Sequence, residues 1–340
     1  MTYRIDTEFD LNGFIGSKIG GRDENQDSAG AVETKLGTII VVCDGMGGAQ
    51  GGKTASMLAV QTIIDDVANA DQHADPKAIL IAAIQHANAE IIQAGIKAPE
   101  LAGMGTTVTA VLINENCATA VHVGDSRIYQ FRNGEKVFRT FDHSLVFQRV
   151  LAGKMTEEQA RTASNSNVIL KALGIYPDLQ FDVVELPYLA GDRFMLCTDG
   201  VWGTMPEKEL IQRICARAYL KEVVDDNLNE IDEMGVKAGG GHDNLTAAVF
   251  DVMCNSKMDV KMSKKHKLYF SILCALLVLS LGCNIYALKW INQSNPSAEP
   301  EIEVVETELE NGVEHLQDPL FDMGNTREGE QAAEADAEEE

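Results

Sequence analysis

The sequence lacks a C-x-x-C pair and an excess of basic residues, and each absence excludes a class of protein. Seven cysteines without such a pair suggest neither a zinc knuckle nor a disulfide framework, so we expect reduced thiols that pack in the interior. Acidic residues outnumber basic ones 52 to 28, which gives a formal net charge of −24. This charge repels the phosphate backbone of nucleic acids, so we expect no nucleic-acid partner.

The first thirty residues also lack the apolar run of roughly 7 to 15 residues that a signal peptide contains. We therefore expect the N-terminal part of the chain to fold in the cytoplasm. With 340 residues in all, the chain is long enough for one large globular domain or two small ones. We place a single domain at residues 1–254.

One long apolar run is present, and it lies near the C-terminus. Residues 268–288 read LYFSILCALLVLSLGCNIYAL and carry no charge over 21 residues, which is enough to cross a bilayer core of roughly 30 Å. The run predicts a transmembrane helix, and a buried core helix is the alternative. Lysines are frequent in the linker 255–267, whereas only Lys289 follows the run before the acidic tail. The positive-inside rule then predicts a single-pass protein of the cytoplasmic membrane with its large domain inside the cell.

The C-terminal segment 289–340 is acidic and poor in aromatic residues. From residue 293 to the end it contains 16 acidic residues and one basic residue, Arg327. Such a composition cannot bury enough apolar surface to form a core, so we expect a disordered tail outside the cell.

Short β-type and helical patterns alternate before the apolar run. The β-type runs lie at 38–43, 106–113, 118–123, 181–186, 193–197 and 246–252, and the helical patterns at 54–68, 76–94, 168–173 and 206–219. A few residues separate 106–113 from 118–123, as in a hairpin, so the sheet is expected to be at least partly antiparallel.

Five aspartates stand near the ends of these elements. Asp44, Asp125 and Asp199 follow β-type runs, and Asp27 and Asp243 lie in glycine-rich or polar loops. Each one alone fits a turn, because Asp-Gly and Asp-Asn pairs favour turns. Five together can converge on one sheet edge, where cations must offset their repulsion.

Oxygen ligands of this kind select Mg²⁺ or Mn²⁺ over zinc. Two such ions about 4 Å apart can hold a bridging hydroxide and clamp the oxygens of a displacement at phosphorus. The pattern therefore indicates metal-assisted hydrolysis of a phosphoester. Arg22 can fork onto a phosphate, or it can form a surface ion pair with Asp23 or Glu24.

Residues 47–54 fit a competing motif. They read GGAQGGKT, which satisfies G-x-x-x-x-G-K-[ST] between a β-type run and a helical pattern. In this alternative the chain binds a nucleoside triphosphate, and Lys53 reaches the terminal phosphates. A P-loop would leave Asp27, Asp125 and Asp243 without a role.

The order of several short motifs resembles one family, the metal-dependent serine/threonine protein phosphatases of type 2C (the PPM family) in their bacterial form. The motifs are GGRDENQDS at 20–28, VVCDGMGG at 41–48, GMGTT at 103–107, VGDSRIY at 123–129, DHS at 142–144, NVILKALG at 167–174, LCTDG at 196–200 and GGHDNLT at 240–246. The resemblance implies a four-layer α-β-β-α sandwich, in which helices flank two antiparallel sheets. It also implies hydrolysis of phosphoserine and phosphothreonine on proteins, with phosphorylated proteins and a cognate kinase as partners.

The resemblance further implies two Mn²⁺ or Mg²⁺ ions, with a third in some members. The metal residues it implies are Asp27, Asp44, Gly45, Asp125, Asp199 and Asp243. In this assignment Asp44 bridges the first two ions, the Gly45 carbonyl binds the second, and Asp125 belongs to the third. Arg22 resembles the arginine that holds the substrate phosphate.

The sequence departs from the family where a general acid is expected. Met46 and Ala49 occupy positions at which relatives carry histidine, so the candidates that remain are a metal-bound water and His143. For His143 we favour the alternative of a structural hydrogen-bonding residue. A separate alternative is a membrane-tethered relative that kept the fold and binds phosphoproteins without turnover.

Overall fold

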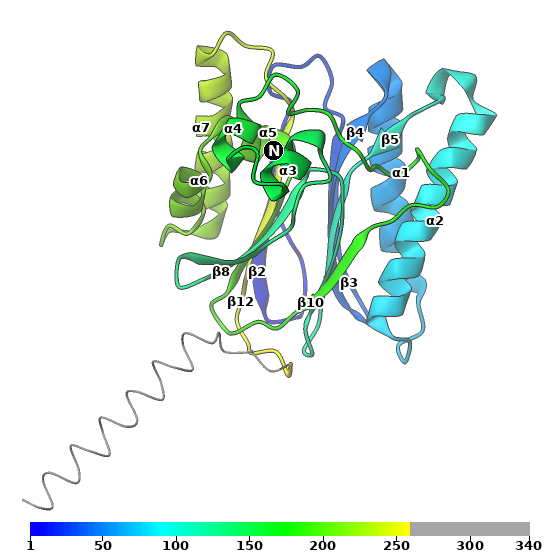
Figure 1. The fold of residues 1–340 in the computed structure, drawn as a ribbon. Helices are drawn as coiled ribbons and strands as arrows, with labels where there is room; N and C mark the ends of the chain where they lie inside the picture. Colours follow the sequence, from blue (N-terminus) through cyan, green and yellow to red (C-terminus); the bar gives the residue numbers. More distant parts are fainter. Residues whose placement is uncertain (259–340) are drawn as a thin grey trace, which may run out of the picture. The chain divides into compact units, whose positions relative to one another are not determined.

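Two antiparallel sheets lie face to face between two layers of helices in the computed structural model, which describes residues 1–258 (Figure 1). The first sheet contains, in spatial order, β1 (Thr2–Arg4), β2 (Leu11–Lys18), β12 (Leu245–Val252), β11 (Arg193–Cys197), β8 (Arg127–Arg132) and β9 (Glu135–Arg139). The second contains β10 (Asp182–Leu186), β7 (Ala118–Val123), β6 (Val108–Ile113), β4 (Gly37–Met46) and β3 (Asp27–Thr34), and β5 (Gly105–Thr106) pairs with the end of β4. The predicted arrangement of sheets is confirmed.

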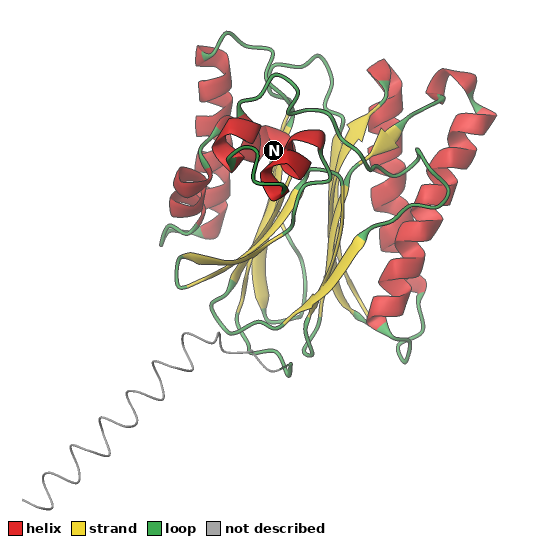
Figure 2. Ribbon diagram, in the orientation of Figure 1, coloured by secondary structure: helices red, strands yellow, loops and turns green. Residues whose placement is uncertain are grey.

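The helices cover the outer faces of the two sheets (Figure 2). On the second sheet lie α1 (Gly48–Asn69) and α2 (Pro76–Lys97), followed by a short 3₁₀ turn at Pro99–Leu101. On the first sheet lie α5 (Asp199–Thr204), α6 (Glu207–Ile214) and α7 (Leu220–Lys237). The connection from β9 to β10 carries two short helices, α3 (Leu145–Leu151) and α4 (Glu157–Arg161). This order gives four layers, as the family resemblance implies.

Strand β4 shows how the sequence positions the core. Its side chains alternate, so that Ile39, Val41 and Cys43 face the two helices while Ile40 and Val42 face the other sheet. Both faces are buried, which explains why this strand is a continuous apolar run. The next residue of the inward series is Asp44, which therefore continues the face that lies between the two sheets.

Helix α2 is long and apolar enough to cross a membrane by length and composition. Its apolar side chains Leu80, Ile84 and Ile91 are fully buried in the core that it shares with α1 and the second sheet. Asp75 caps its first turn by accepting hydrogen bonds from two backbone N–H groups. The composition of α2 is thus explained by packing in the core.

Some local predictions were wrong. Residues 168–173, predicted as helix, form an extended strap with isolated bridges from Ile169 to Ser144 and from Leu173 to Thr106. The helix predicted at 206–219 ends at Ile214, and a separate helix, α7, was missed. Asp27 was assigned to a loop but is the first residue of β3. The predicted transmembrane helix 268–288 and tail 289–340 lie outside the described residues, as does all but the start of the linker 255–267.

Candidate functional site

Aspartates from both sheets meet at one end of the sandwich and surround a cavity of about 690 Å³. Among the residues that line it are Arg22, Asp44, Gly45, Asp199 and Asp243. Asp27 and Asp125 do not line the cavity, but their carboxyl groups interact electrostatically with those that do. The structure therefore brings together the residues that the sequence singled out.

The second sheet supplies Asp27 and Asp44. They are directly opposite each other in the β3–β4 pairing, so their side chains share one face. The backbone of Asp44 is held on both sides: its N–H donates to the Thr107 hydroxyl at 2.9 Å, and its carbonyl accepts from the Thr107 N–H at 2.8 Å. Asp27 accepts a hydrogen bond of 2.9 Å from the Thr198 hydroxyl, which comes from the other sheet.

Gly45 allows strand β4 to lie against the first turn of helix α1. A Cβ atom at this residue would come within 2.0 Å of the Gly52 carbonyl oxygen, so no larger residue fits here. The Gly45 N–H also donates to the carbonyl of Gln26 at 3.2 Å, which ties this turn to the strand that begins at Asp27.

The first sheet supplies Asp199 and Asp243. Asp199 is the first residue of α5, just beyond β11, and Asp243 lies in the loop before β12. The exposed guanidinium of Arg22 donates to a carboxyl oxygen of Asp243 at 2.8 Å. The sequence allowed two roles for Arg22, binding of a phosphate or an ion pair with Asp23 or Glu24. The structure shows instead an ion pair with Asp243, in the cavity.

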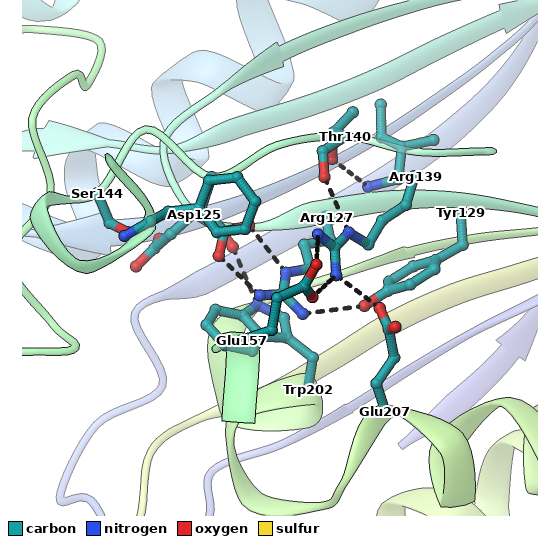
Figure 3. A network of polar contacts seen from close by, with 12 residues as sticks. Asp125, Arg127, Tyr129, Arg139, Thr140, Ser144, Glu157, Trp202 and Glu207 are labelled. Atoms are coloured by element: carbon teal, nitrogen blue, oxygen red, sulfur yellow. Dashed lines mark hydrogen bonds and ion pairs between the residues drawn. The ribbon is translucent and has the colours of Figure 1, made fainter. Parts of the chain in front are cut away.

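Asp125 lies in the turn that passes from β7 in the second sheet to β8 in the first, and a buried polar network surrounds it (Figure 3). The indole N–H of Trp202 donates to the Asp125 carbonyl at 2.9 Å. The Arg127 guanidinium lies 3.5 Å from the centre of the Trp202 ring and makes two hydrogen bonds, of 2.8 and 2.7 Å, to Asp142. Asp125 is thus held by groups that are themselves buried and paired.

The same network reaches the short helices beyond β9. Arg139, almost fully buried, forms ion pairs with Glu157 of α4 and Glu207 of α6 (Figure 3). Arg161 of α4 donates to the carbonyl of Gly203 at the end of α5 at 2.8 Å. Since α5 begins at Asp199, the segment that carries α4 is attached to a helix of the site.

The aspartates strongly perturb one another. Burial raises the pKa of Asp27 to about 7 and the pKa of Asp199 to about 6, and repulsion from Asp243 adds to both shifts. Burial also raises the pKa values of Asp44 and Asp125 well above the usual range, with repulsion from Asp199 as the next cause. Such a cluster is unfavourable without a positive charge among the carboxylates.

Unpaired oxygens show that these residues fit metal ions. One carboxyl oxygen each of Asp27, Asp125 and Asp199 is buried and accepts no hydrogen bond from the part of the chain that is described. Buried polar atoms are normally paired, so these oxygens have room for a partner that a protein donor does not supply. Carboxylate oxygens arranged in this way suit hard divalent cations such as Mg²⁺ and Mn²⁺.

The competing P-loop is not formed. Helix α1 begins at Gly48, so residues that would curl around a phosphate in a P-loop are already helical. Lys53 lies on the surface 3.7 Å from Glu24. The interpretation as a nucleotide-binding loop was therefore wrong, because the glycine run starts a helix and does not form a cradle.

His143 is also not part of the cavity wall. Its backbone N–H donates to the Gly124 carbonyl at 2.7 Å, and its Nδ1 accepts from the Gly124 N–H at 3.2 Å. The ring thus fastens the residue before Asp125. Met46, by contrast, lines the cavity.

The sequence missed several residues that complete the site. Ile169, from the strap predicted as helix, and Asn167, just before the strap, line the cavity. The hydroxyl of Thr198 and the indole of Trp202 hold Asp27 and Asp125. The signal for three of them is their place inside the motifs NVILKALG and LCTDG, and Trp202 stands two residues after the second motif.

Comparisons with known proteins agree with this geometry. The family model described as protein phosphatase 2C matches residues 17–231. The serine/threonine phosphatase stp of Listeria innocua is 31% identical over 240 residues, which cover 68% of this chain and 91% of that protein. The solved serine/threonine phosphatase of S. agalactiae is 30% identical, with a TM-score of 0.65, over 71% of this chain and 99% of that one.

A further solved structure holds metal. The catalytic domain of the serine/threonine protein phosphatase PstP, in complex with two manganese ions, is 30% identical, with a TM-score of 0.58, over 72% of this chain and 98% of that one. The family model covers well over half of the chain, and the fold, the motifs and the relatives all agree. The chain belongs to the protein phosphatase 2C family.

Proposed function

We propose that this protein hydrolyses phosphoserine and phosphothreonine on other proteins with the help of Mn²⁺ or Mg²⁺. The observation that carries the proposal is the convergence of five aspartates, three of them with unpaired buried oxygens, beside a cavity that also contains Arg22. The relatives named as serine/threonine phosphatases and the PstP structure with two manganese ions support the substrate class and the metal.

Each carboxylate of the cluster can be assigned to one or more of the proposed metal ions. Asp44 lies between the two halves of the cluster, because it faces Asp27 in its own sheet and repels Asp199 of the other. We assign Asp44, Asp199 and Asp243 to the first ion, and Asp44 with the Gly45 carbonyl to the second, near Asp27. Asp125 and Asp199 are available for a third. When bound, such ions activate a water for attack on phosphorus and stabilise the charge of the phosphoryl group.

Arg22 holds the substrate phosphate in this proposal. Its guanidinium is about half exposed and lines the cavity beside Asp243. A planar guanidinium donates two parallel hydrogen bonds to phosphate oxygens, which a lysine cannot copy. The ion pair with Asp243 keeps Arg22 oriented toward the cavity before substrate arrives.

The residues of the cavity wall also bear on proton transfer to the leaving oxygen. Among the described residues that line the cavity, none is a histidine. His143 Nδ1 already accepts a hydrogen bond from the Gly124 N–H and the ring does not line the cavity. We therefore infer that water in the cavity donates the proton to the leaving serine or threonine oxygen.

We further propose that residues 268–288 anchor the protein in the cytoplasmic membrane. The uncharged run and the lysines before it support an orientation with the phosphatase domain inside the cell and the acidic segment 289–340 outside. A short linker would hold the active site near the membrane, where a membrane-bound kinase or its substrates are suitable partners. Protease protection of vesicle-embedded protein tests this orientation, and cleavage of the large domain from the outer side would contradict it.

The activity is tested with the full chain and a phosphothreonine peptide. We expect phosphate release that requires Mn²⁺ or Mg²⁺ and stops in chelator. Peptide binding without release would favour the alternative of a phosphoprotein binder. ATP serves as a competing substrate, and we expect phosphate release from the peptide to be unaffected by it.

A further inference from the structure

A buried histidine on β7 has no hydrogen-bond partner for either ring nitrogen. The His122 side chain is 1% exposed, and neither Nδ1 nor Nε2 makes a hydrogen bond of ordinary geometry with a described residue, although the Ser126 backbone lies close to the ring. An imidazole that is buried and unpaired is unfavourable, and native interiors rarely keep such groups. The ring therefore has a position for a partner that the protein itself does not supply.

Two further metal-binding side chains lie next to this ring. The rings of His122 and His143 are 4.7 Å apart between centroids. Asp182 is directly opposite His122 in the β7–β10 pairing, so both side chains share one face of the sheet. His143 Nε2 and an oxygen of Asp182 are 3.2 Å apart, and one ligand atom from each of the three residues lies within 4.8 Å of the others.

We propose that His122, His143 and Asp182 form a second metal site, separate from the carboxylate cluster, that takes a transition-metal ion of the zinc class. Two imidazole nitrogens and one carboxylate oxygen suit Zn²⁺, Co²⁺ or Ni²⁺, whereas Mg²⁺ prefers oxygen ligands alone. The inference does not depend on the proposed phosphatase activity.

One distance within this set already matches a tetrahedral site, and all three ligand atoms lie within 4.8 Å of one another. Bonds of about 2.0 to 2.1 Å to a tetrahedral ion separate the ligand atoms by about 3.3 Å. The pair formed by His143 and Asp182 already has this separation. Asp182 is mostly exposed, so its carboxylate can turn to complete the geometry, and solvent at this edge can supply a fourth ligand.

The charge state of the histidines agrees with metal binding. Burial lowers the pKa of His122 to about 3 and also lowers the pKa of His143. Both rings are therefore neutral at pH 7, which is the form that binds metal. The cations whose charge reaches His122 are Lys171 and Arg127, and Arg127 is already paired with Asp142.

Metal binding at His143 would replace its hydrogen bond with the Gly124 N–H by a bond from Nε2 to the metal. Its Nδ1 accepts from the Gly124 N–H, so its proton lies on Nε2, which faces Asp182. A metal on Nε2 moves that proton to Nδ1 and releases the Gly124 N–H. Gly124 precedes Asp125, so occupancy of this site is linked to the position of one aspartate of the main cluster.

The test uses the full chain, stripped of metal and then supplied with excess Mg²⁺ so that the carboxylate cluster is filled. Co²⁺ is added as a coloured substitute for Zn²⁺, and we expect the intense visible bands of a four-coordinate ion at one equivalent. Zn²⁺ should then displace the Co²⁺ and remove these bands. The Asp182→Asn variant should weaken Co²⁺ binding about 100-fold, and His143→Asn should abolish the bands.

The matched control is Asp178→Asn, which removes an exposed carboxylate outside the cluster and should leave Co²⁺ binding unchanged. Asp182 is also exposed, so its variant tests the proposal even if His143→Asn fails to fold. The same Co²⁺ spectrum and affinity in the wild type and in Asp182→Asn would overturn the proposal. So would the absence of four-coordinate bands from the wild type.

Discussion

The indole N–H of Trp202 donates a hydrogen bond of 2.9 Å to the backbone carbonyl of Asp125. Trp202 belongs to α5, the helix that begins with Asp199. One side chain therefore fixes the distance between two aspartates of the site. The same ring also packs against the Arg127 guanidinium, so a single residue connects the site to the ionic network behind it.

We expect Trp202→Phe to lower the free energy of unfolding by about 1 to 3 kcal/mol, because the buried carbonyl of Asp125 loses its donor and Arg127 loses part of its ring contact. Urea unfolding of the full chain measures the change. Tyr176→Phe, at an exposed ring, is the control and should change stability by less than about 0.5 kcal/mol. Equal stability of the Trp202 variant and the wild type would contradict this role.

Arg127→Met should cost about 3 to 5 kcal/mol, because it leaves the carboxylate of Asp142 buried without a partner. The double variant Arg127→Met/Asp142→Leu removes both charges and should be more stable than Arg127→Met alone. Thermal and urea unfolding of the two variants give the comparison. A double variant that is less stable than the single one would show that the Asp142 charge is not the cause.

Asp44→Asn and Asp243→Asn should each reduce kcat/KM for a phosphothreonine peptide by about 100-fold or more, with the fold retained, because each removes a carboxylate that we assign to the metal ions. Circular dichroism checks the fold, and Asp178→Asn is the control for loss of an unrelated carboxylate. Turnover near the wild-type rate in either variant would refute the assignment of the first metal.

Without metal, stability should fall as the pH rises from 5 to 8. The pKa values of Asp27 and Asp199 are raised to about 7 and about 6 in the folded protein, above the unfolded value of about 3.9. The folded state therefore binds more protons than the unfolded state over this range, and raising the pH disfavours it.

The pH effect is measured as Tm in chelator at several pH values. Excess Mn²⁺ should remove the fall in Tm, because the cation replaces the lost protons among the carboxylates. Asp27→Asn should flatten the dependence in chelator. A Tm in chelator that rises steadily from pH 5 to 8 would be inconsistent with the raised pKa values.

Lys53→Ala should leave phosphopeptide hydrolysis within about twofold of the wild type, because its ion pair with Glu24 is exposed and weak. Steady-state kinetics with the phosphothreonine peptide provide the measurement, and Arg22→Ala provides the contrast. Arg22→Ala should raise KM strongly, since the phosphate loses its guanidinium.

The sequence predicted the chemistry of the site better than the path of the chain around it. Ile40, Val42 and Asp44 lie on the same face of β4 because side chains alternate along a strand. The place of Asp44 between the sheets was therefore predictable. The strap at 168–173 was not, because its apolar residues fit a helical period equally well and tertiary bridges decide its extended form. Which hydroxyl or indole supports each aspartate depends on contacts between distant segments, such as Thr198 with Asp27.

The division of the aspartates between the sheets has a mechanical consequence. Asp27 and Asp44 belong to one sheet, while Asp199 and Asp243 extend from the other, so a cation bound among them as proposed would link the two sheets at the end where the cavity lies. Separating the sheets at that end would then require breaking the bonds between the cation and the carboxylates. Resistance to force, proteolysis and heat should therefore rise with metal concentration together with catalysis, because the same bonds serve both.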